Sequence, residues 1–269
     1  GFAQASDVKV IPVTSKIEDN FALPSIELFE KKINKKTKAI LICNPCNPTG
    51  YVYSKEEIIH IANLAKKNDL FIIVDEVYRE FIYSDLKHFS ILEDETFFDN
   101  AILIDSTSKR YSLCGARIGF IVSKNSKFIE TCMKFALARL SPPTVALIAA
   151  NNALKSDNKY IDNVIKEYSL RRKVLIGELS KINNIEFSDP MGAFYSIIKL
   201  PVKNAEEFAK FLLTDFSINN ESVMLAPAAG FYSSNDNGKD EVRIAFVLNS
   251  EKIKRAINII NIGLKEYIG

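Results

Sequence analysis

The chain has 269 residues, of which 47% are apolar and 25% are charged. Lys and Arg number 35 and Asp and Glu 33, so the net charge of +2 gives no electrostatic reason to expect a nucleic acid or an anionic membrane as a partner. This composition excludes collagen-like, disordered and disulfide-scaffold classes. No run reaches the roughly 18 apolar residues of a membrane-spanning helix, and residues 1–10 lack the pattern of a secretory signal, so we expect a cytoplasmic location.

Strand-like and helix-like patterns alternate in the first half of the chain. Nearly continuous apolar runs predict strands that are covered on both faces, at residues 8–13, 39–43, 70–75, 101–106 and 118–123. Ser54 and Glu57 have the spacing of a capping box, which predicts that a helix begins there. The alternation predicts an α/β fold with a mainly parallel sheet flanked by helices, in which ligands bind beyond the carboxyl ends of the strands.

The pattern changes after about residue 125. Further helices are expected at residues 125–139, 144–154, 161–182, 205–216 and 250–267, and further strands at 194–200, 223–225 and 242–247. We place a domain boundary in the long helix, so that residues 1–156 form one domain and residues 157–269 form the linking helix and a smaller α+β domain.

The first motif is NPCNPTG, at Asn44–Gly50, directly after the predicted strand 39–43. The two prolines restrict the backbone and Gly50 permits a turn into the following helix, so a rigid turn is the simplest interpretation. A stiff loop at the carboxyl end of a strand is also where α/β proteins present polar groups to ligands.

The second motif is VDEVY, in which an apolar strand ends in Asp75 and Tyr78 follows three residues later. A carboxylate at the edge of a buried sheet is costly to desolvate and therefore needs a cationic or hydrogen-bonding partner. An acidic residue that begins a turn explains this segment about equally well.

The third and strongest motif joins Ser106, Ser108 and Lys109 to Arg117, which follows the lysine by eight residues. Hydroxyls, an ammonium and a guanidinium, with glycines between them, form a dense set of donors for an anion. A solvated basic loop explains poorly why apolar strands flank the segment on both sides.

The fourth motif is Arg243, in the otherwise apolar strand EVRIAF. Such an arginine points outward or meets a counter-ion, and the alternation of a strand permits either.

Cys43 and Cys46 form a CxxC, which is compatible with a redox pair or half of a zinc site. No second CxxC follows, and His60 and His88 do not have ligand spacing, so free and mostly buried thiols are the preferred interpretation and no metal site is expected.

Taken together and in this order, the four motifs resemble the class I/II (fold type I) aminotransferases that use pyridoxal 5'-phosphate, a group that includes the aspartate aminotransferases. The matching features are the NPxNPTG loop, the D-x-x-Y step, the S-x-S-K segment with G-x-R-x-G, and the RIAF strand. Further agreement occurs at Gly192–Tyr195 and at Ala226–Phe231. The resemblance implies that residues 1–156 are the remainder of a large cofactor-binding domain.

The resemblance also implies roles for individual residues. Lys109 would form the Schiff base with the cofactor and move the substrate proton, and Asp75 would pair with the pyridine nitrogen. Tyr78 and Asn47 would donate to the phenolic oxygen, with Asn47 also close to the substrate. The phosphate would be bound by Ser106, Ser108 and Arg117. Arg243 would bind the substrate α-carboxylate.

Two expectations concern the extent of the chain. Family members have a glycine-rich phosphate loop and a stacking aromatic ring well before NPxNPTG, whereas here Gly50 is the next glycine after Gly1. The chain is therefore expected to be an amino-terminally truncated, carboxyl-terminal fragment that binds the cofactor weakly and transaminates poorly by itself. Homodimerisation is implied by the resemblance alone.

The sequence does not identify the side chain of the substrate. Aspartate with 2-oxoglutarate is the first expectation, and aromatic amino acids and alanine are alternatives. A carbon–sulfur lyase or an aminocyclopropane-carboxylate synthase of the same fold would use the same residues, and a catalytically silent interaction module is an alternative of another class. A nucleotide-binding protein lacks support, because neither GxGxxG nor GxxxxGK[ST] occurs.

Overall fold

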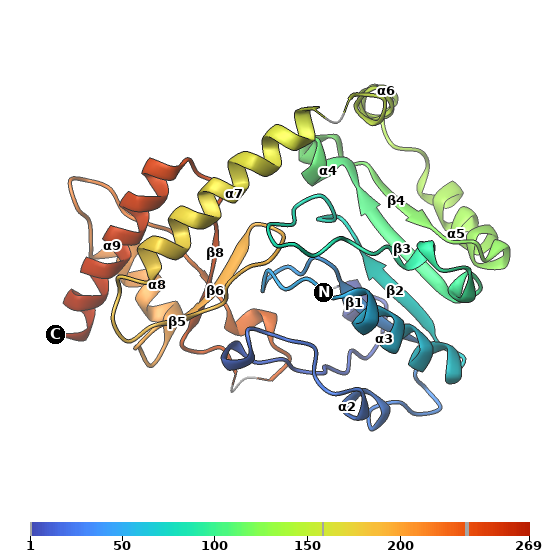
Figure 1. The fold of residues 1–269 in the computed structure, drawn as a ribbon, viewed down its shortest axis with the longest axis horizontal. Helices are drawn as coiled ribbons and strands as arrows, with labels where there is room; N and C mark the ends of the chain where they lie inside the picture. Colours follow the sequence, from blue (N-terminus) through green and yellow to red (C-terminus); the bar gives the residue numbers. More distant parts are fainter. Residues whose placement is uncertain (1, 158, 235–236) are drawn as a thin grey trace. The chain divides into compact units, whose positions relative to one another are not determined.

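A computed structural model describes residues 2–157, 159–234 and 237–269 (Figure 1). The chain divides into two compact units. The parallel-sheet unit comprises Lys35–Ser169 and Pro190–Ala193, and the antiparallel-sheet unit comprises Gly1–Asn34, Leu170–Asp189 and Phe194–Gly269. This division differs from the expected boundary at residue 157, because the first 34 residues pack with the carboxyl-terminal part and the chain changes unit within a helix.

The parallel-sheet unit is built on four strands, β1 (Ala39–Cys43), β2 (Phe71–Asp75), β3 (Ala101–Ser106) and β4 (Gly119–Val122). They lie in chain order, with β1, β2 and β3 parallel and β4 antiparallel to β3. Cys43 lies opposite Asp75, and Asp75 lies opposite Ile104. The expected mainly parallel α/β sheet is therefore confirmed, and the ends of its parallel strands share one edge.

Helix α3 (Lys55–Lys67) begins at the capping box that the sequence predicts. The Glu57 N–H donates to Ser54 Oγ at 3.2 Å, and the Ser54 N–H donates to Glu57 Oε2 at 2.7 Å. Its buried stripe includes Ile58, Ile61 and Ala62, and it packs against β1 and β2 (Figure 1). The other helices of this unit are α4 (Thr107–Arg110), α5 (Ser126–Arg139) and α6 (Thr144–Leu154).

The antiparallel-sheet unit has the strand order β5-β6-β8-β7. The strands are β5 (Glu186–Phe187), β6 (Tyr195–Lys199), β7 (Ala226–Pro227) and β8 (Glu241–Ala245). Its helices are α1 (Phe2–Ala5), α2 (Ile26–Glu30), α8 (Ala205–Thr214) and α9 (Ser250–Ile268), while α7 (Lys159–Leu179) belongs to both units. Phe208 and Leu212 of α8 and Ile257 of α9 are buried in the core of this unit.

Short 3₁₀ turns complete the two units, at Ile17–Asp19, Ile91–Glu93, Glu95–Phe97, Cys114–Ala116 and Ala229–Phe231. Within the described residues, no helix is both long enough and apolar enough to cross a membrane.

Two predicted strands are wrong. Residues 8–13 have no regular secondary structure, and Val8, Val10 and Ile11 are exposed, so this apolar run pairs with no strand in the described chain. Residues 223–225 form no strand, and the pairing with β8 begins later, at Ala226. Apolar composition alone does not distinguish a strand from an unpaired extended segment.

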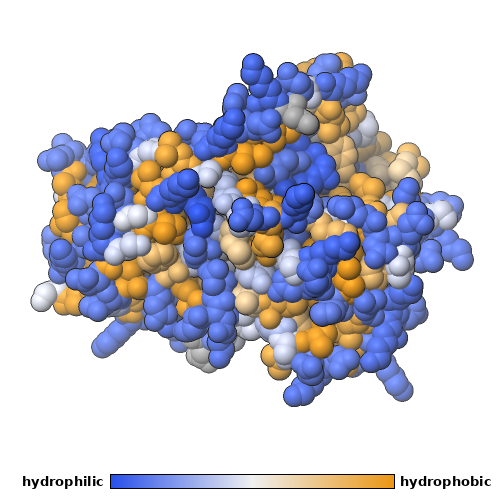
Figure 2. Space-filling view, viewed as in Figure 1, coloured by the Kyte–Doolittle hydropathy of each residue, from blue (hydrophilic) through white to orange (hydrophobic). Residues whose placement is uncertain are grey.

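The parallel-sheet unit exposes many apolar side chains. Leu41 on β1 is 65% exposed, and Ile121 and Val122 on β4 are exposed as well. Phe135 on α5 and Val145 on α6 are 73% and 80% exposed. Figure 2 shows patches of hydrophobic residues between the hydrophilic ones on the face that it views. Large exposed apolar patches commonly mark a surface that contacts another protein segment.

Candidate functional site

The loop Asn44–Gly50 follows β1 directly. The side chain of Asn44 is buried and its Oδ1 accepts from the Tyr53 N–H at 2.9 Å, while the Asn44 N–H donates to the Asp75 carbonyl oxygen at 2.9 Å. Both Asn–Pro peptide bonds, before Pro45 and Pro48, are cis. The loop is therefore held between the end of β1 and the end of β2, and it leaves Asn47 exposed.

Asp75 is the last residue of β2. Its Oδ1 accepts from the Val77 N–H at 3.1 Å. Desolvation raises the pKa of the Asp75 carboxyl above its ordinary value, the charges of Asp105 and Glu76 act in the same direction, and the Val77 hydrogen bond and Lys109 oppose the shift. A nearby cation would offset the desolvation of this carboxylate.

Lys109 lies on α4, the short helix that follows β3. The Ser106 side chain caps this helix by accepting from the Ser108 N–H at 3.1 Å. The Lys109 Nζ atom lies 5.7 Å from the ring centroid of Tyr78, which is only 3% exposed. The structure thus brings Lys109, Tyr78 and Asp75 together at the carboxyl ends of β2 and β3.

The three candidate anion donors occupy the same segment. Ser106 Oγ lies 2.8 Å from Ser108 Oγ and 2.8 Å from the Ile118 carbonyl oxygen, so the two hydroxyls are adjacent. Arg117 is exposed and has a left-handed backbone with φ of 57°. Its guanidinium donates to the Cys114 carbonyl oxygen at 2.9 Å. Part of its hydrogen-bonding capacity is therefore used within the loop.

A charged cluster around Arg110 escapes sequence reasoning. Arg110 is buried, and it lies 2.8 Å from Asp105 Oδ2 and 2.9 Å from Glu80 Oε1. Arg79 contacts the same carboxylates, at 3.1 Å from Glu80 and 3.4 Å from Asp105. The cluster joins the turn after Tyr78 to the helix that carries Lys109. The one signal in the sequence is an acidic residue, Asp105, directly after the apolar run 101–104.

A second buried acid lies beside Asp75. Glu76 is fully buried, and its carboxylate lies 2.9 Å from His88 Nε2 and 2.9 Å from the Ser90 hydroxyl. The Ile91 N–H also donates to it, at 3.1 Å. These contacts hold the two ends of the segment 76–91 together, and the partners lie too far apart in sequence for a local pattern to reveal them. Among the residues that the structure describes, no group of three or more His, Cys, Asp or Glu side chains is arranged for a metal ion.

Gly192 packs tightly against the NPCNPTG loop. Its N–H donates to the Gly50 carbonyl oxygen at 2.9 Å. A β-carbon added at this position would lie 2.6 Å from Val52 Cγ2, 2.7 Å from Pro45 Cβ and 2.8 Å from the Phe81 carbonyl oxygen. No heavier side chain fits without displacing this backbone.

Gly192→Ala is therefore expected to destabilise the protein by about 1–3 kcal/mol, the usual cost of overpacking. Urea unfolding followed by circular dichroism measures the change in the unfolding midpoint. Gly177→Ala is the matched control, because no atom lies within 4 Å of the added carbon in α7, and it should stabilise by up to about 1 kcal/mol. Equal midpoints for the two variants would contradict the packing argument.

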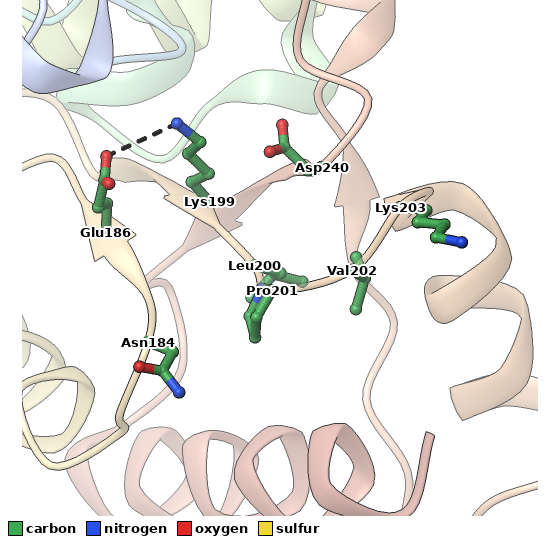
Figure 3. Close-up of a pocket in the computed structure, with 8 residues that line it drawn as sticks. All are labelled: Asn184, Glu186, Lys199, Leu200, Pro201, Val202, Lys203 and Asp240. Carbon is green, nitrogen blue, oxygen red and sulfur yellow. Dashed lines mark ion pairs between the residues drawn. The ribbon is translucent and has the colours of Figure 1, made fainter. Parts of the chain in front are cut away.

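Arg243 lies on β8 of the antiparallel-sheet unit, opposite Ile197 on β6. Its guanidinium carbon lies 4.6 Å from the ring centroid of Tyr195 and 4.8 Å from that of Phe231. Two aromatic rings therefore orient the planar guanidinium by cation–π contacts. The same unit holds a separate pocket of 410 Å³ (Figure 3), whose lining includes Lys199 and Glu186 but none of the site residues expected from the sequence.

Comparison with known proteins places these features in a family. Residues 2–260 match the model of the family "Aminotransferase class I and II". The aspartate aminotransferase of Pyrococcus abyssi is 33% identical over 263 residues, which are 96% of this chain and 65% of that protein. The aromatic-amino-acid aminotransferase 2 of Thermococcus litoralis is 30% identical, with 96% and 65% covered.

A solved structure, the alanine aminotransferase of Pyrococcus furiosus, is 29% identical and superposes with a TM-score of 0.84, covering 98% of this chain and 66% of that chain. The chain thus spans about 65% of the length of the curated relatives named above. The match runs from the NPCNPTG loop through the Lys109 segment to Arg243 and beyond. The chain belongs to the class I and II aminotransferases.

Proposed function

We propose that this chain carries the catalytic residues of a pyridoxal-phosphate-dependent aminotransferase, which exchanges an amino group between an amino acid and a 2-oxo acid. The main support for the proposal is that Lys109, Tyr78 and Asp75 lie close together at one edge of the sheet. The Lys109 Nζ atom is 5.7 Å from the centroid of the Tyr78 ring. Family membership and the names of the relatives support the same reaction class.

The residues present fit the cofactor. Asp75 is a partly buried carboxylate whose pKa is raised by desolvation, so a protonated ring nitrogen is a suitable partner for it. Pyridoxal phosphate, when bound, supplies a conjugated ring that accepts the electron pair left on a substrate carbon when its proton is removed. Asp75 keeps that ring nitrogen protonated.

Lys109 holds the reactive amine. Lys109 would hold the cofactor through its aldehyde, and its amine would carry the proton taken from the substrate α-carbon. The buried Tyr78 and the exposed Asn47 donate to the phenolic oxygen of the cofactor. Asn47 would also contact the substrate.

Ser106, Ser108 and Arg117 are the phosphate donors in this proposal. The adjacency of the two hydroxyls, at 2.8 Å, supports a shared anion site. In the antiparallel-sheet unit, Arg243 binds the substrate α-carboxylate. The two aromatic rings that flank its guanidinium support this role. They orient the paired N–H groups that can donate two hydrogen bonds to a carboxylate.

Aspartate and 2-oxoglutarate are the proposed substrates, and a homodimer is the proposed assembly. The relatives bear the names of aspartate, aromatic-amino-acid and alanine aminotransferases, so they support an amino acid substrate more strongly than any single side chain. The exposed apolar residues of α5 and α6 support contact with a second copy. The cytoplasmic location stays a prediction.

A screen of amino donors against 2-oxoglutarate tests the proposal, with the purified full-length gene product and added pyridoxal phosphate. Glutamate is expected to form, with the highest kcat/KM for aspartate among the donors. Pyruvate and ammonia released without an acceptor oxo acid would favour a carbon–sulfur lyase. No turnover with any donor, together with no labelling of Lys109, would favour a catalytically silent module.

A further inference from the structure

Two thiols lie together where β1 meets the NPCNPTG loop. Cys43 is the last residue of β1 and Cys46 lies three residues later, in the turn. Their side chains are within hydrogen-bonding contact of each other, and both are partly exposed and reduced. The Cys43 sulfur also lies 3.3 Å from the Pro45 carbonyl oxygen. The sequence interpretation of free thiols is compatible with this geometry, but it gives no reason for their contact.

The two thiols differ in their acidity. The hydrogen bond from Cys43 lowers the pKa of Cys46 to about 7, and hydrogen bonds from the side chain and backbone of Thr49 act in the same direction against burial. The same contact with Cys46, and then burial, raise the pKa of Cys43. Cys46 is therefore the more readily ionised of the two thiols near neutral pH. This asymmetry suits an attacking thiol and a resolving thiol.

We propose that Cys43 and Cys46 are a redox-active dithiol, which closes to an intramolecular disulfide by exchange with a small disulfide of the oxidised-glutathione class. The Cys46 thiolate attacks the small disulfide, forming a mixed disulfide and expelling one thiolate. The Cys43 thiol then loses its proton and attacks the Cys46 sulfur, expelling the second thiolate. Two protein thiols are oxidised, one disulfide is reduced to two thiols, and the protons go to the released thiolates.

Cys43 and Cys46 lie close to two residues of the candidate site, Asn47 and Asp75. The backbone N–H of Asn47 donates to the Cys43 sulfur, and Cys43 lies opposite Asp75 in the strand register. A disulfide brings the two sulfurs to about 2.05 Å, much closer than a hydrogen-bonding contact. The chain between them must move, and Asn47 is the next residue along that chain. Because Asn47 and Asp75 are cofactor residues only under the proposed function, this consequence rests on that proposal, whereas disulfide formation does not.

Peptide mapping by mass spectrometry tests the dithiol directly. The whole protein is equilibrated in buffers of increasing ratio of oxidised to reduced glutathione, then alkylated and digested. The expected result is an internal disulfide between Cys43 and Cys46, which dithiothreitol reverses, and in Cys43→Ser a glutathione adduct on Cys46 instead. The control variant Cys114→Ser/Cys132→Ser should form the Cys43–Cys46 bond equally well. Alkylation of both Cys43 and Cys46 at every ratio would overturn the proposal.

Titration with pyridoxal phosphate tests the consequence. The oxidised protein is expected to bind the cofactor up to about tenfold more weakly than the reduced protein, the effect of losing about one hydrogen bond. Cys46→Ser should show the same affinity before and after treatment. Equal affinity of the reduced and the disulfide-bonded protein for pyridoxal phosphate would overturn the proposed effect of the disulfide on the site. Absence of binding by either form would count against the proposed function, while the disulfide map still decides the redox chemistry.

Discussion

Lys109→Ala should reduce transamination by at least about 10²–10⁴-fold, because the general acid–base contribution of one positioned group has that size. The variant also removes the amine that attaches the cofactor, so borohydride reduction should no longer fix a phosphopyridoxyl group on the peptide that contains residue 109. In the unchanged protein the same reduction should label Lys109. The rate with aspartate and 2-oxoglutarate and the peptide map are measured on the same samples.

Two further variants separate the chemistry of this amine from its charge. Lys109→Arg keeps a positive charge near Tyr78, but a guanidinium is not deprotonated in proteins, so this variant should be as inactive as Lys109→Ala. Lys127→Ala removes an exposed lysine of α5 and should retain activity. A label that persists in Lys109→Ala, or activity close to normal in Lys109→Arg, would contradict the assignment of the reactive amine.

The sequence was most informative where local chemistry decides the structure. The strands at 39–43 and 101–106 have the predicted bounds, because each begins with an apolar run that pairs with β2 in the parallel part of the sheet. The capping box at Ser54 begins α3 as expected, since its two hydrogen bonds involve residues only three positions apart.

Features that depend on distant partners could not be predicted in this way. The run at 8–13 has the composition of a strand, yet pairing requires a neighbour, and none is present in the described part of the chain. The contact of Arg110 with Glu80 joins residues thirty positions apart, through a turn whose path the local pattern does not determine. The grouping of the first 34 residues with the carboxyl-terminal part is likewise a product of tertiary packing.

A second large effect is expected when the charged cluster around Arg110 is disrupted, namely a loss in the free energy of unfolding. In Asp105→Asn the shape of the side chain is kept and its Oδ1 still accepts from the Ser106 N–H, a hydrogen bond of 2.7 Å. Arg110 and Arg79 are then left to share Glu80 alone. Breaking a buried ion pair from one side costs about 3–5 kcal/mol, because the remaining charge stays desolvated. We expect the free energy of unfolding to fall by about 3 kcal/mol, at the lower end of this range. Arg79 is partly exposed, so solvent screens its interaction with Asp105.

Equilibrium unfolding in urea measures this loss, and Glu178→Gln is the control. Its ion pair with Lys181 is at the surface, so the control should lose less than about 1 kcal/mol. The double variant Asp105→Asn/Arg110→Met removes both members of the pair and should lose less than the sum of the single changes, by about 0.5–3 kcal/mol. Strict additivity would mean that the two charges do not stabilise each other, and the cluster would then have no part in holding α4, and with it Lys109, against the end of β3.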